Sequence, residues 1–225
     1  MRAVDRITHA AVTLDAARCG FGYRDSAFKG RERGRYIIVG VTFALRPGGA
    51  TLEAARYPEL RRALGDPREP LPLRAVRDAV LALRRDKSMV IDPADENRRS
   101  AGSFFTNPTL APAALEAARA RIEAAGVLHA GEDFPRYPGG GDRVKLSAAW
   151  LIERAGFAKG TRHGAAGIST RHTLALVNRG GATAAEILAL ARRVRQGVLD
   201  RFGVALTPEP DLVGFEPAEV ADLLP

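Results

Sequence analysis

The pattern of apolar and polar residues predicts strands near the start of the chain and in its second half. The first fifteen residues alternate weakly between apolar and polar side chains, which predicts one or two strands. β-branched and aromatic residues predict further strands over residues 36–45, 173–178 and 204–206. Residues 46–72 and 129–143 are rich in turn-forming and polar residues, and we expect both to be surface loops.

Apolar residues at helical spacing, with matching start and stop signals, predict four helices. Their approximate ends are Leu73 and Asp86, Pro112 and Gly126, Ser147 and Gly156, and Thr183 and Gly203. Thr183 and Glu186 form a capping box at the start of the last helix. Helices and strands mix without strict βαβ alternation, so we expect an α+β fold.

The composition is that of an ordinary soluble globular protein. The chain has 225 residues, a length that suits one large domain or two small ones. Its residues are 46% hydrophobic and 27% charged, which is typical of a globular protein. Lys and Arg number 34 against 26 Asp and Glu, giving a net charge of +8 that suits an anionic partner. The arginines are scattered in pairs along the chain, which favours a solvated surface over a nucleic-acid footprint.

The sequence lacks a disulfide pair, a membrane span and a signal peptide, and these three absences guide the expected cellular location. Cys19 is the single cysteine, so the chain has no internal disulfide, and we expect Cys19 to be a small buried hydrophobe. No run reaches about 18 apolar residues, and the first fifteen residues lack the apolar centre of a signal peptide. We therefore expect a cytoplasmic protein without a membrane partner, and we assign no metal ligands.

Residues 99–108, which read RSAGSFFTNP, form the most distinctive segment of the chain. Gly102 lets a ligand approach the backbone closely, and Ser103 beside it is a small hydroxyl that can act as a nucleophile or an acid. The two phenylalanines that follow can exclude water, and the Asn-Pro pair is a natural turn. The same pattern is also typical of a buried strand after a turn, so the residues alone leave both interpretations open.

Four further segments favour the interpretation of residues 99–108 as a functional site, because of their amino-acid sequences and their order in the chain. They read FGYRDSAFK at residues 21–29, LRRDK at residues 83–87, VKLSAAWLIE at residues 144–153 and LTPE at residues 206–209. Together with SAGSFFTNP, they resemble the collinear motifs of the UDP-N-acetylenolpyruvoylglucosamine reductases, also called UDP-N-acetylmuramate dehydrogenases. Members of this family are flavoenzymes of peptidoglycan precursor synthesis.

The resemblance implies reduction of UDP-N-acetylglucosamine enolpyruvate to UDP-N-acetylmuramate with NADPH, through FAD. Hydride added to the terminal carbon of the enolpyruvyl group leaves an enolate-like dianion, which needs positive charge and hydrogen-bond donors. By resemblance, Arg24 clamps the carboxylate, Ser103 protonates the carbon that bears it, and Glu209 holds the developing acid or assists proton delivery. Taken alone, the residue pattern favours an ordinary loop arginine paired with Asp25, and a solvent-facing carboxylate at position 209.

The resemblance also implies contacts with the nucleotide end of the substrate, where a diphosphate is bound by lysines, amides and flexible glycine loops. The matching positions are Tyr57, Lys87, Asn107, Tyr137, Lys145 and His172. His172 is the residue expected to touch the uridine. The residue types alone leave open solvated lysines and a tyrosine that packs within a loop.

The sequence departs from the family ahead of the GYRDS motif, where only about twenty residues stand and no G-x-G-x-x-G run occurs. We therefore expect residues 1–95 to be a partial FAD-binding domain with an exposed sheet edge. Residues 96–205 would form the UDP-sugar-binding domain, and residues 206–225 a C-terminal strand that returns to the flavin domain. Such a chain would be a weak or inactive enzyme, either a truncated reading frame or a remnant whose missing half is a separate polypeptide.

Two alternatives to a reductase remain open. The first is a UDP-sugar-binding module without catalysis, which would use Asn107, Tyr137 and Lys145. The second is a basic nucleic-acid-binding protein, which only the net charge supports. The sequence holds no recognition-helix motif and no interleaved aromatic residues, so we do not expect a nucleic-acid partner.

Overall fold

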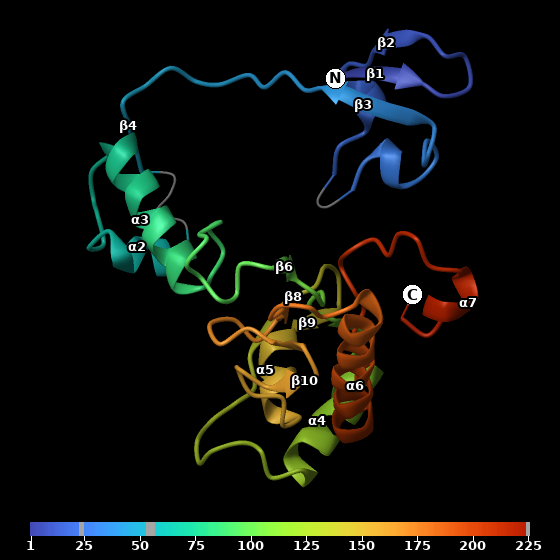
Figure 1. Ribbon diagram of the computed structural model, residues 1–225. Coiled ribbons are helices and arrows are strands. Elements are labelled where there is room, and N and C mark those ends of the chain that lie inside the picture. The colour runs from blue at the N-terminus through green and yellow to red at the C-terminus, as the bar shows by residue number, and fades with distance from the viewer. Residues whose placement is uncertain (23–24, 53–56, 224–225) are drawn as a thin grey trace. The chain divides into compact units, whose positions relative to one another are not determined.

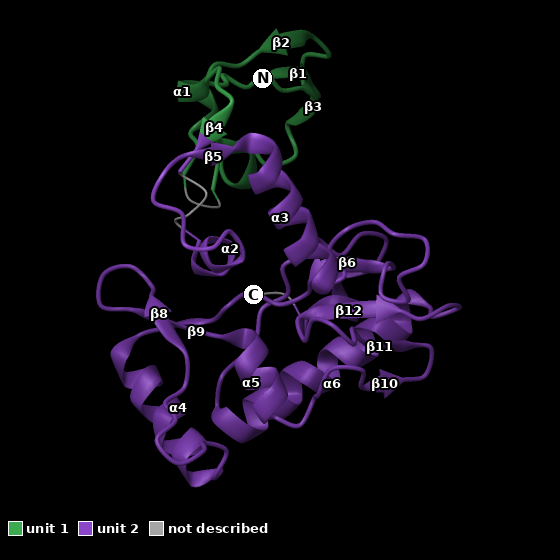
Figure 2. Ribbon diagram, turned by 90° about the vertical axis from the view of Figure 1, so that its left-hand side faces the viewer, with its two compact units in different colours: residues 1–50 green, residues 51–225 purple. Residues whose placement is uncertain are grey.

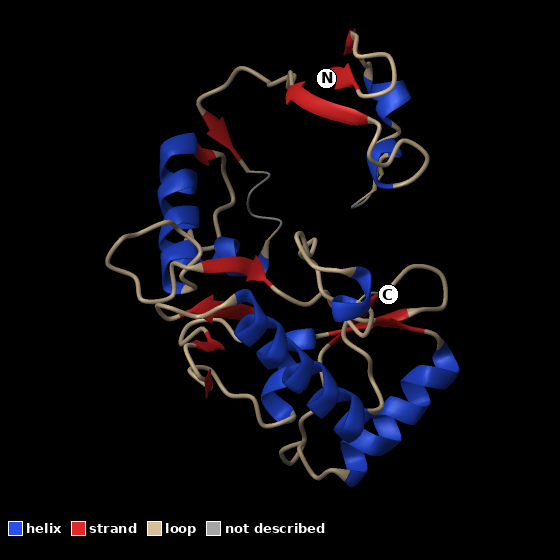
Figure 3. Cartoon of the chain, turned by 45° about the vertical axis from the view of Figure 1, so that its right-hand side comes forward, coloured by secondary structure: helices blue, strands red, loops and turns tan. Residues whose placement is uncertain are grey.

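The structure, a computed structural model, describes residues 1–22, 25–52 and 57–223 (Figure 1). The chain divides into two compact units, residues 1–50 and residues 51–225 (Figure 2). Helices and strands mix in the chain without a repeating βαβ order, which confirms the α+β class (Figure 3). The predicted domain boundaries at residues 95 and 205, and the assignment of a flavin-domain remnant, stay predictions.

The first unit is a small antiparallel sheet with short helical turns. Strand β1 (Arg2–Asp5) lies between β2 (Ala11–Thr13) and β3 (Tyr36–Gly40), so the two strands predicted in the first fifteen residues are confirmed. The connections include α1 (Ala16–Cys19) and the 3-10 turn η1 (Ala27–Lys29).

A few side chains stabilise this unit. Ala3, Leu14 and Cys19 form its buried cluster, as expected for a cysteine that acts as a small hydrophobe. The buried Asp5 carboxylate accepts hydrogen bonds from the Arg35 guanidinium at 2.9 and 3.1 Å, and these bonds hold the pKa of Asp5 below its usual range. The pair therefore joins the start of β3 to the end of β1.

The strand predicted over residues 36–45 is shorter in the structure. Only β3 pairs, because its partner β1 contributes four residues to the ladder. Residues 41–45 continue without strand pairing, and the side chains of Val41, Phe43 and Leu45 are exposed. The residue pattern identified a segment suited to a strand, but pairing sets the length of a strand.

The second unit begins with a helix pair. A two-stranded ladder joins β4 (Ala50–Thr51) to β5 (Leu71–Pro72), and α2 (Pro58–Ala63) lies between them in sequence. Most described residues of the segment 46–72 are exposed, as expected for a surface segment, but it also contains β4, α2 and β5, which the sequence did not predict. Helix α3 (Leu73–Asp86) matches the predicted helix, although none of its residues is buried.

Two small sheets form the centre of the second unit. The first has the order β10 (Arg162–His163), β11 (Ala166–Ile168), β12 (Ala175–Asn178) and β6 (Ser100–Ser103). The second has the order β7 (Thr109–Leu110), β9 (Val144–Leu146) and β8 (Arg136–Pro138). Strand β8 corrects the prediction of a loop over residues 129–143, and β12 begins two residues later than predicted.

Helices cover these sheets as their apolar spacing predicts. Helix α6 (Ala184–Phe202) packs against α4 (Pro112–Ala124), α5 (Ala148–Arg154) and strands β11 and β12 (Figure 1). The capping box of Thr183 and Glu186 and the C-cap at Gly203, with φ 70°, are both confirmed. The buried residues of these three helices belong to one continuous core with Phe104, Phe105 and Leu206.

The C-terminal segment differs from its prediction. Residues 204–206 form no strand, although Val204 and Leu206 are buried in the core. Pro208 makes an isolated bridge with Phe105, and α7 (Pro217–Val220) follows where a strand was expected. An extended backbone is enough to bury Val204 and Leu206 while residue 205 stays exposed. This alternation therefore does not require a neighbouring strand.

Candidate functional site

Residues 103–108 join three other segments of the second unit. Ser103 pairs with Ala175 of β12, and the backbone N–H of Phe104 donates to the carbonyl oxygen of Leu174 at 2.7 Å. On the other side, the backbone N–H groups of Thr106 and Glu209 donate to the carbonyl oxygens of Thr207 and Phe104 at 3.0 and 2.9 Å. The segment is therefore held by backbone hydrogen bonds on both edges.

Ser103 lies at the end of β6 and is partly exposed. Gly102 before it has φ 85°, a conformation that glycine adopts without strain and that turns the chain into the serine. The next two residues, Phe104 and Phe105, are 4% and 1% exposed, and their rings meet edge to face at 5.2 Å. The buried-strand interpretation is thus correct for the two phenylalanines, while the serine before them remains accessible.

The structure pairs the backbone of Glu209 with Phe104, the residue that follows this serine. Glu209 is exposed and follows Pro208, and its backbone is fixed to Phe104, the residue after Ser103. Arg24, the third residue expected at the reacting group, lies outside the described residues. Its approach to Ser103 and Glu209 therefore stays a prediction.

Three of the predicted nucleotide contacts lie on or beside the β7-β9-β8 sheet. Tyr137 and Lys145 are register partners, and Thr109 faces Lys145 from the other side. Tyr137 is half exposed and Lys145 is partly buried. The Asn107 Oδ1 atom accepts a hydrogen bond at 2.9 Å from the backbone N–H of Ala148, the first residue of α5. Asn107 thus anchors the helix start next to the two side chains.

His172 lies in the turn that leads into β12. Its carbonyl oxygen accepts from the backbone N–H of Ala175 at 3.0 Å, and its Nδ1 atom is 3.3 Å from the backbone nitrogen of Leu174. This bond makes Nδ1 the acceptor and leaves the proton on Nε2. Because Leu174 and Ala175 pair with Phe104 and Ser103, the turn lies close to the serine segment.

Charged side chains of both signs act on the ring of His172. Burial lowers the pKa of His172, the charges of Lys87 and Lys159 lower it further, and the charge of Glu153 opposes them. The two lysines therefore lie close enough to the ring to interact with it electrostatically. Lys159 is a residue that sequence reasoning missed, because a single lysine in the loop GFAKG has no feature that separates it from a solvated lysine.

Lys87 and Tyr57 lie on the α2–α3 helix pair. Lys87 is the C-cap residue of α3 and forms an ion pair with Glu59 of α2. Tyr57 is the N-cap residue of α2 and is 71% exposed. The place of Tyr57 in the site stays a prediction.

Comparison with known proteins decides the family. Residues 92–213 match the family described as UDP-N-acetylenolpyruvoylglucosamine reductase, C-terminal domain. The chain belongs to this family. The match contains Ser103, Asn107, Tyr137, Lys145, His172 and Glu209. The resemblance that the five motifs indicated is thereby confirmed.

Curated reductases extend the similarity over nearly all of the chain. The UDP-N-acetylenolpyruvoylglucosamine reductase of Thermobifida fusca is 54% identical over 211 residues, which is 93% of this chain and 58% of the relative. The reductases of Streptomyces avermitilis and Nocardia farcinica are 49% and 50% identical, over 95% of this chain and 58% and 55% of their own lengths. The chain thus spans a little over half the length of the reductases it matches.

Within residues 1–22, 25–52 and 57–223, no cluster of three or more histidine, cysteine, aspartate or glutamate side chains could hold a metal ion. In the same part of the chain, each helix is too short or too polar to cross a membrane.

Proposed function

We propose that residues 51–225 bind the UDP-sugar substrate of a UDP-N-acetylenolpyruvoylglucosamine reductase. The single observation that supports this most strongly is the hydrogen-bonded position of residues 103–107. In this segment Phe104, the residue after Ser103, bonds to the backbone of Glu209, and Asn107 bonds to the start of α5, which follows the strand that carries Lys145. Groups suited to a carboxylate-bearing end and to a nucleotide end thus lie along one continuous stretch of backbone.

At the enolpyruvyl end, the proposed chemistry is delivery of one proton. Ser103 would protonate the carbon that bears the carboxylate, and Glu209 would hold the developing acid or assist the transfer. A serine hydroxyl is a weak acid, so it needs a fixed geometry and a strongly basic enolate. The rigid backbone around Gly102 and Phe104 supports the first requirement. Arg24 would bind the substrate carboxylate through its planar guanidinium group.

At the nucleotide end, the proposed ligands are cations and polar side chains. Lys145 and Tyr137 would contact the UDP-sugar from the β7-β9-β8 sheet, with Asn107 at its edge. Lys87 and Lys159 interact electrostatically with the His172 ring, so both cations would lie within reach of a diphosphate bound beside it. His172 would touch the uridine, and Tyr57 is a further proposed contact.

The reductase reaction also requires FAD and NADPH, as the family resemblance implies. FAD would supply the hydride, so we tested whether the described part of residues 1–50 fits its pyrophosphate. Helix α1 has only four residues, and the Asp15 carboxylate already accepts from the backbone N–H of Arg18 at its N-terminus at 2.8 Å. A carboxylate at this position repels phosphate, so these residues do not fit the group. We therefore assign no hydride step to this chain.

Calorimetry on the full chain tests the proposal. We expect UDP-N-acetylglucosamine enolpyruvate and UDP to bind, and we expect the Ser103→Ala variant to bind them equally well. Absence of binding by the folded wild-type chain would overturn the proposal.

A second measurement separates a reductase from a binding module without catalysis. Substrate-dependent oxidation of NADPH in the presence of FAD, lost in Ser103→Ala, would identify a reductase. Binding without oxidation, and without a flavin absorption band near about 450 nm in the purified chain, would identify the binding module.

A further inference from the structure

The connection between α3 and β6 is anchored by a buried side chain, Asn97, which is 2% exposed. Its Nδ2 group donates hydrogen bonds to the hydroxyl oxygens of Thr170 at 2.9 Å and Ser88 at 3.2 Å. Its Oδ1 atom accepts a hydrogen bond from the backbone N–H of Thr170 at 3.0 Å. Loss of these partners would leave buried polar atoms unpaired, so the amide ties the two segments together.

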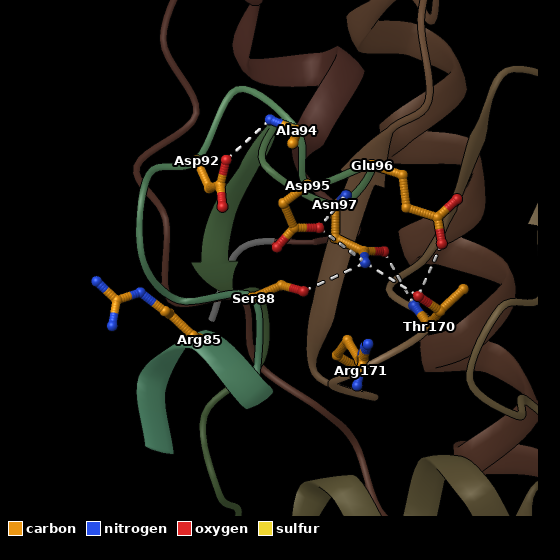
Figure 4. Close-up of a pocket in the computed structure, with 9 residues that line it drawn as sticks. All are labelled: Arg85, Ser88, Asp92, Ala94, Asp95, Glu96, Asn97, Thr170 and Arg171. Atoms are coloured by element: carbon orange, nitrogen blue, oxygen red, sulfur yellow. Dashed lines mark hydrogen bonds between the residues drawn. The ribbon is translucent and has the colours of Figure 1, made fainter. Parts of the chain in front are cut away.

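Figure 4 shows that these bonds span a cavity. Ser88, Asn97 and Thr170 all line it, and its volume is about 320 Å³. Dashed lines lead from Asn97 to Ser88 on one side and to Thr170 on the other (Figure 4). Ser88 and Thr170 belong to two segments that border this cavity. The Asn97 amide bonds to both residues, so it forms a bridge between the two segments.

On one side of the bridge lies the end of α3, which has the hydrogen bonds of a Schellman cap. The backbone N–H groups of Ser88 and Met89 donate to the carbonyl oxygens of Arg85 and Arg84 at 2.9 and 2.7 Å. Ser88 has φ 56°, a left-handed conformation that this cap normally gives to glycine. The serine therefore needs other contacts to hold it there.

Asn97 and Asp95 supply those contacts. Asp95 accepts hydrogen bonds from the Ser88 hydroxyl and the backbone N–H of Asn97, and these bonds lower its pKa although burial acts in the opposite direction. The Asn97 amide donates to the same serine hydroxyl. Lys87 directly precedes Ser88 and is the C-cap residue of α3. The hydrogen bonds to Ser88 thus fix the direction in which Lys87 leaves the helix.

On the other side of the bridge lies the turn that carries His172. Thr170 precedes His172 by two residues, and the fully buried Ser169 hydroxyl accepts from the backbone N–H groups of Arg171 and His172 at 3.1 and 3.2 Å. This turn is therefore internally rigid. Asn97 binds the rigid turn through both the backbone and the side chain of Thr170.

We propose that Asn97 is a positioning residue that holds Lys87 beside His172 by joining the end of α3 to the turn of residues 169–172. The contribution of Lys87 and His172 to nucleotide binding rests on the proposed function. Their juxtaposition rests on the hydrogen bonds of Asn97 and on the electrostatic interaction of Lys87 with the ring. Asn97 itself touches no proposed substrate group.

The charges around His172 make this juxtaposition measurable. Lys87 and Lys159 lower the pKa of the ring, and Glu153 raises it. Glu153 belongs to α5 and Lys159 to the loop before β10. The hydrogen bonds of Asn97 lead to Ser88, which follows Lys87, and to the rigid turn at Thr170, so a change at Asn97 should reach the ring through Lys87.

The experiment is an NMR titration of His172 in the full chain, without ligand. We expect Lys87→Met to raise the pKa of His172, because a nearby cation is lost. Asn97→Ala should raise it in the same direction, and Asn97→Ala added to Lys87→Met should raise it no further. A further rise in the double variant, or no rise in the single Asn97 variant, would overturn the proposal.

Two more variants keep the test decisive. Asn178→Ala removes an amide with a similar set of bonds, to Ala182 and Gly180, and should leave the pKa of His172 unchanged. If Asn97→Ala does not fold, Ser88→Gly replaces it, since glycine suits the left-handed cap but cannot bond to Asn97. It should raise the pKa of His172, and an unchanged value would count against the proposal. Because no ligand is present, a failure to bind UDP would leave this result standing.

Discussion

The backbone N–H of Glu209 donates a hydrogen bond of 2.9 Å to the carbonyl oxygen of Phe104. This bond fixes a residue of the C-terminal segment next to the residue that follows Ser103. Phe104 and Phe105 lie in the core beneath the bond, so the two chain segments are stabilised by burial as well as by hydrogen bonding. The position of Glu209 therefore depends on the packing of the two aromatic residues.

Substitution of Gly102 tests the backbone that presents Ser103. Gly102 has φ 85°, and a Cβ atom there would meet no other heavy atom within 4 Å. We expect Gly102→Ala to lower the free energy of unfolding by about 1–2 kcal/mol, because an alanine resists the left-handed conformation. Urea unfolding followed by circular dichroism measures this loss.

Gly139→Ala is the comparison for that experiment. A Cβ atom at Gly139 would lie 2.8 Å from both the Arg143 carbonyl oxygen and the Thr109 side chain, so this variant should lose more stability than Gly102→Ala. Equal stability of wild type and Gly102→Ala would show that the turn before Ser103 does not need its observed conformation.

The helices of the second unit could be predicted from the sequence because their signals are local. Helix α6 has its capping box, its apolar spacing and its terminal glycine within one stretch of about twenty residues. Strands were predicted less well, because a ladder needs a partner that the local pattern does not contain. Residues 41–45 and 204–206 have strand composition but find no ladder, whereas the polar segment Arg136–Pro138 finds one as β8.

In the candidate site, too, local sequence identified single residues but did not show which distant segments pair. The sequence motifs identified Ser103 and Glu209 separately, but only the pairing of Phe105 with Pro208 shows that their two segments lie side by side. Asn97 and Lys159 were not predicted, because their importance comes from Thr170 and His172, which are distant in the sequence.

Asn107 should contribute to stability through one backbone group. Its Oδ1 atom accepts from the N–H of Ala148, a residue that is 0% exposed. Asn107→Ala leaves that buried N–H without a partner, and we expect a loss of about 1–2 kcal/mol in unfolding free energy. Asn107→Asp keeps an acceptor oxygen and should lose less. If alanine and aspartate have the same effect in urea unfolding, the hydrogen bond does not stabilise the start of α5.

Lys145 should contribute to nucleotide affinity more than to stability. It pairs in register with Tyr137 and Thr109, and the proposed function makes it a diphosphate ligand. We expect Lys145→Met to weaken UDP binding by about tenfold, since one charged hydrogen bond is lost. The exposed Lys29 is the matched control, because Lys29→Met removes the same charge from residues 1–50. Calorimetry in which both variants bind UDP like wild type would exclude Lys145 from the site.

His172 should make stability and binding depend on pH in opposite ways. The fold lowers the pKa of His172 below its ordinary value of 6.5, so the unfolded chain takes up the proton more readily. The stability that comes from the neutral ring is complete above about pH 6.5 and is lost as the pH falls toward the lowered pKa. His172→Gln should therefore lose less stability than wild type between pH 7.5 and pH 5 in urea unfolding.

Binding of UDP should shift the protonation equilibrium of His172, because the diphosphate brings negative charge to the cluster of His172, Lys87 and Lys159. The protonated ring is then favoured, and we expect the pKa of His172 to rise when UDP is added to the full chain. By linkage, UDP should bind more tightly as the pH falls through the pKa of the ligand-bound form toward the lower pKa of the free form. Histidine NMR signals followed with and without UDP measure both effects, and His172→Gln should remove the pH dependence. A pKa that stays constant on saturation with UDP would show that the diphosphate binds away from His172, while calorimetry would still report binding.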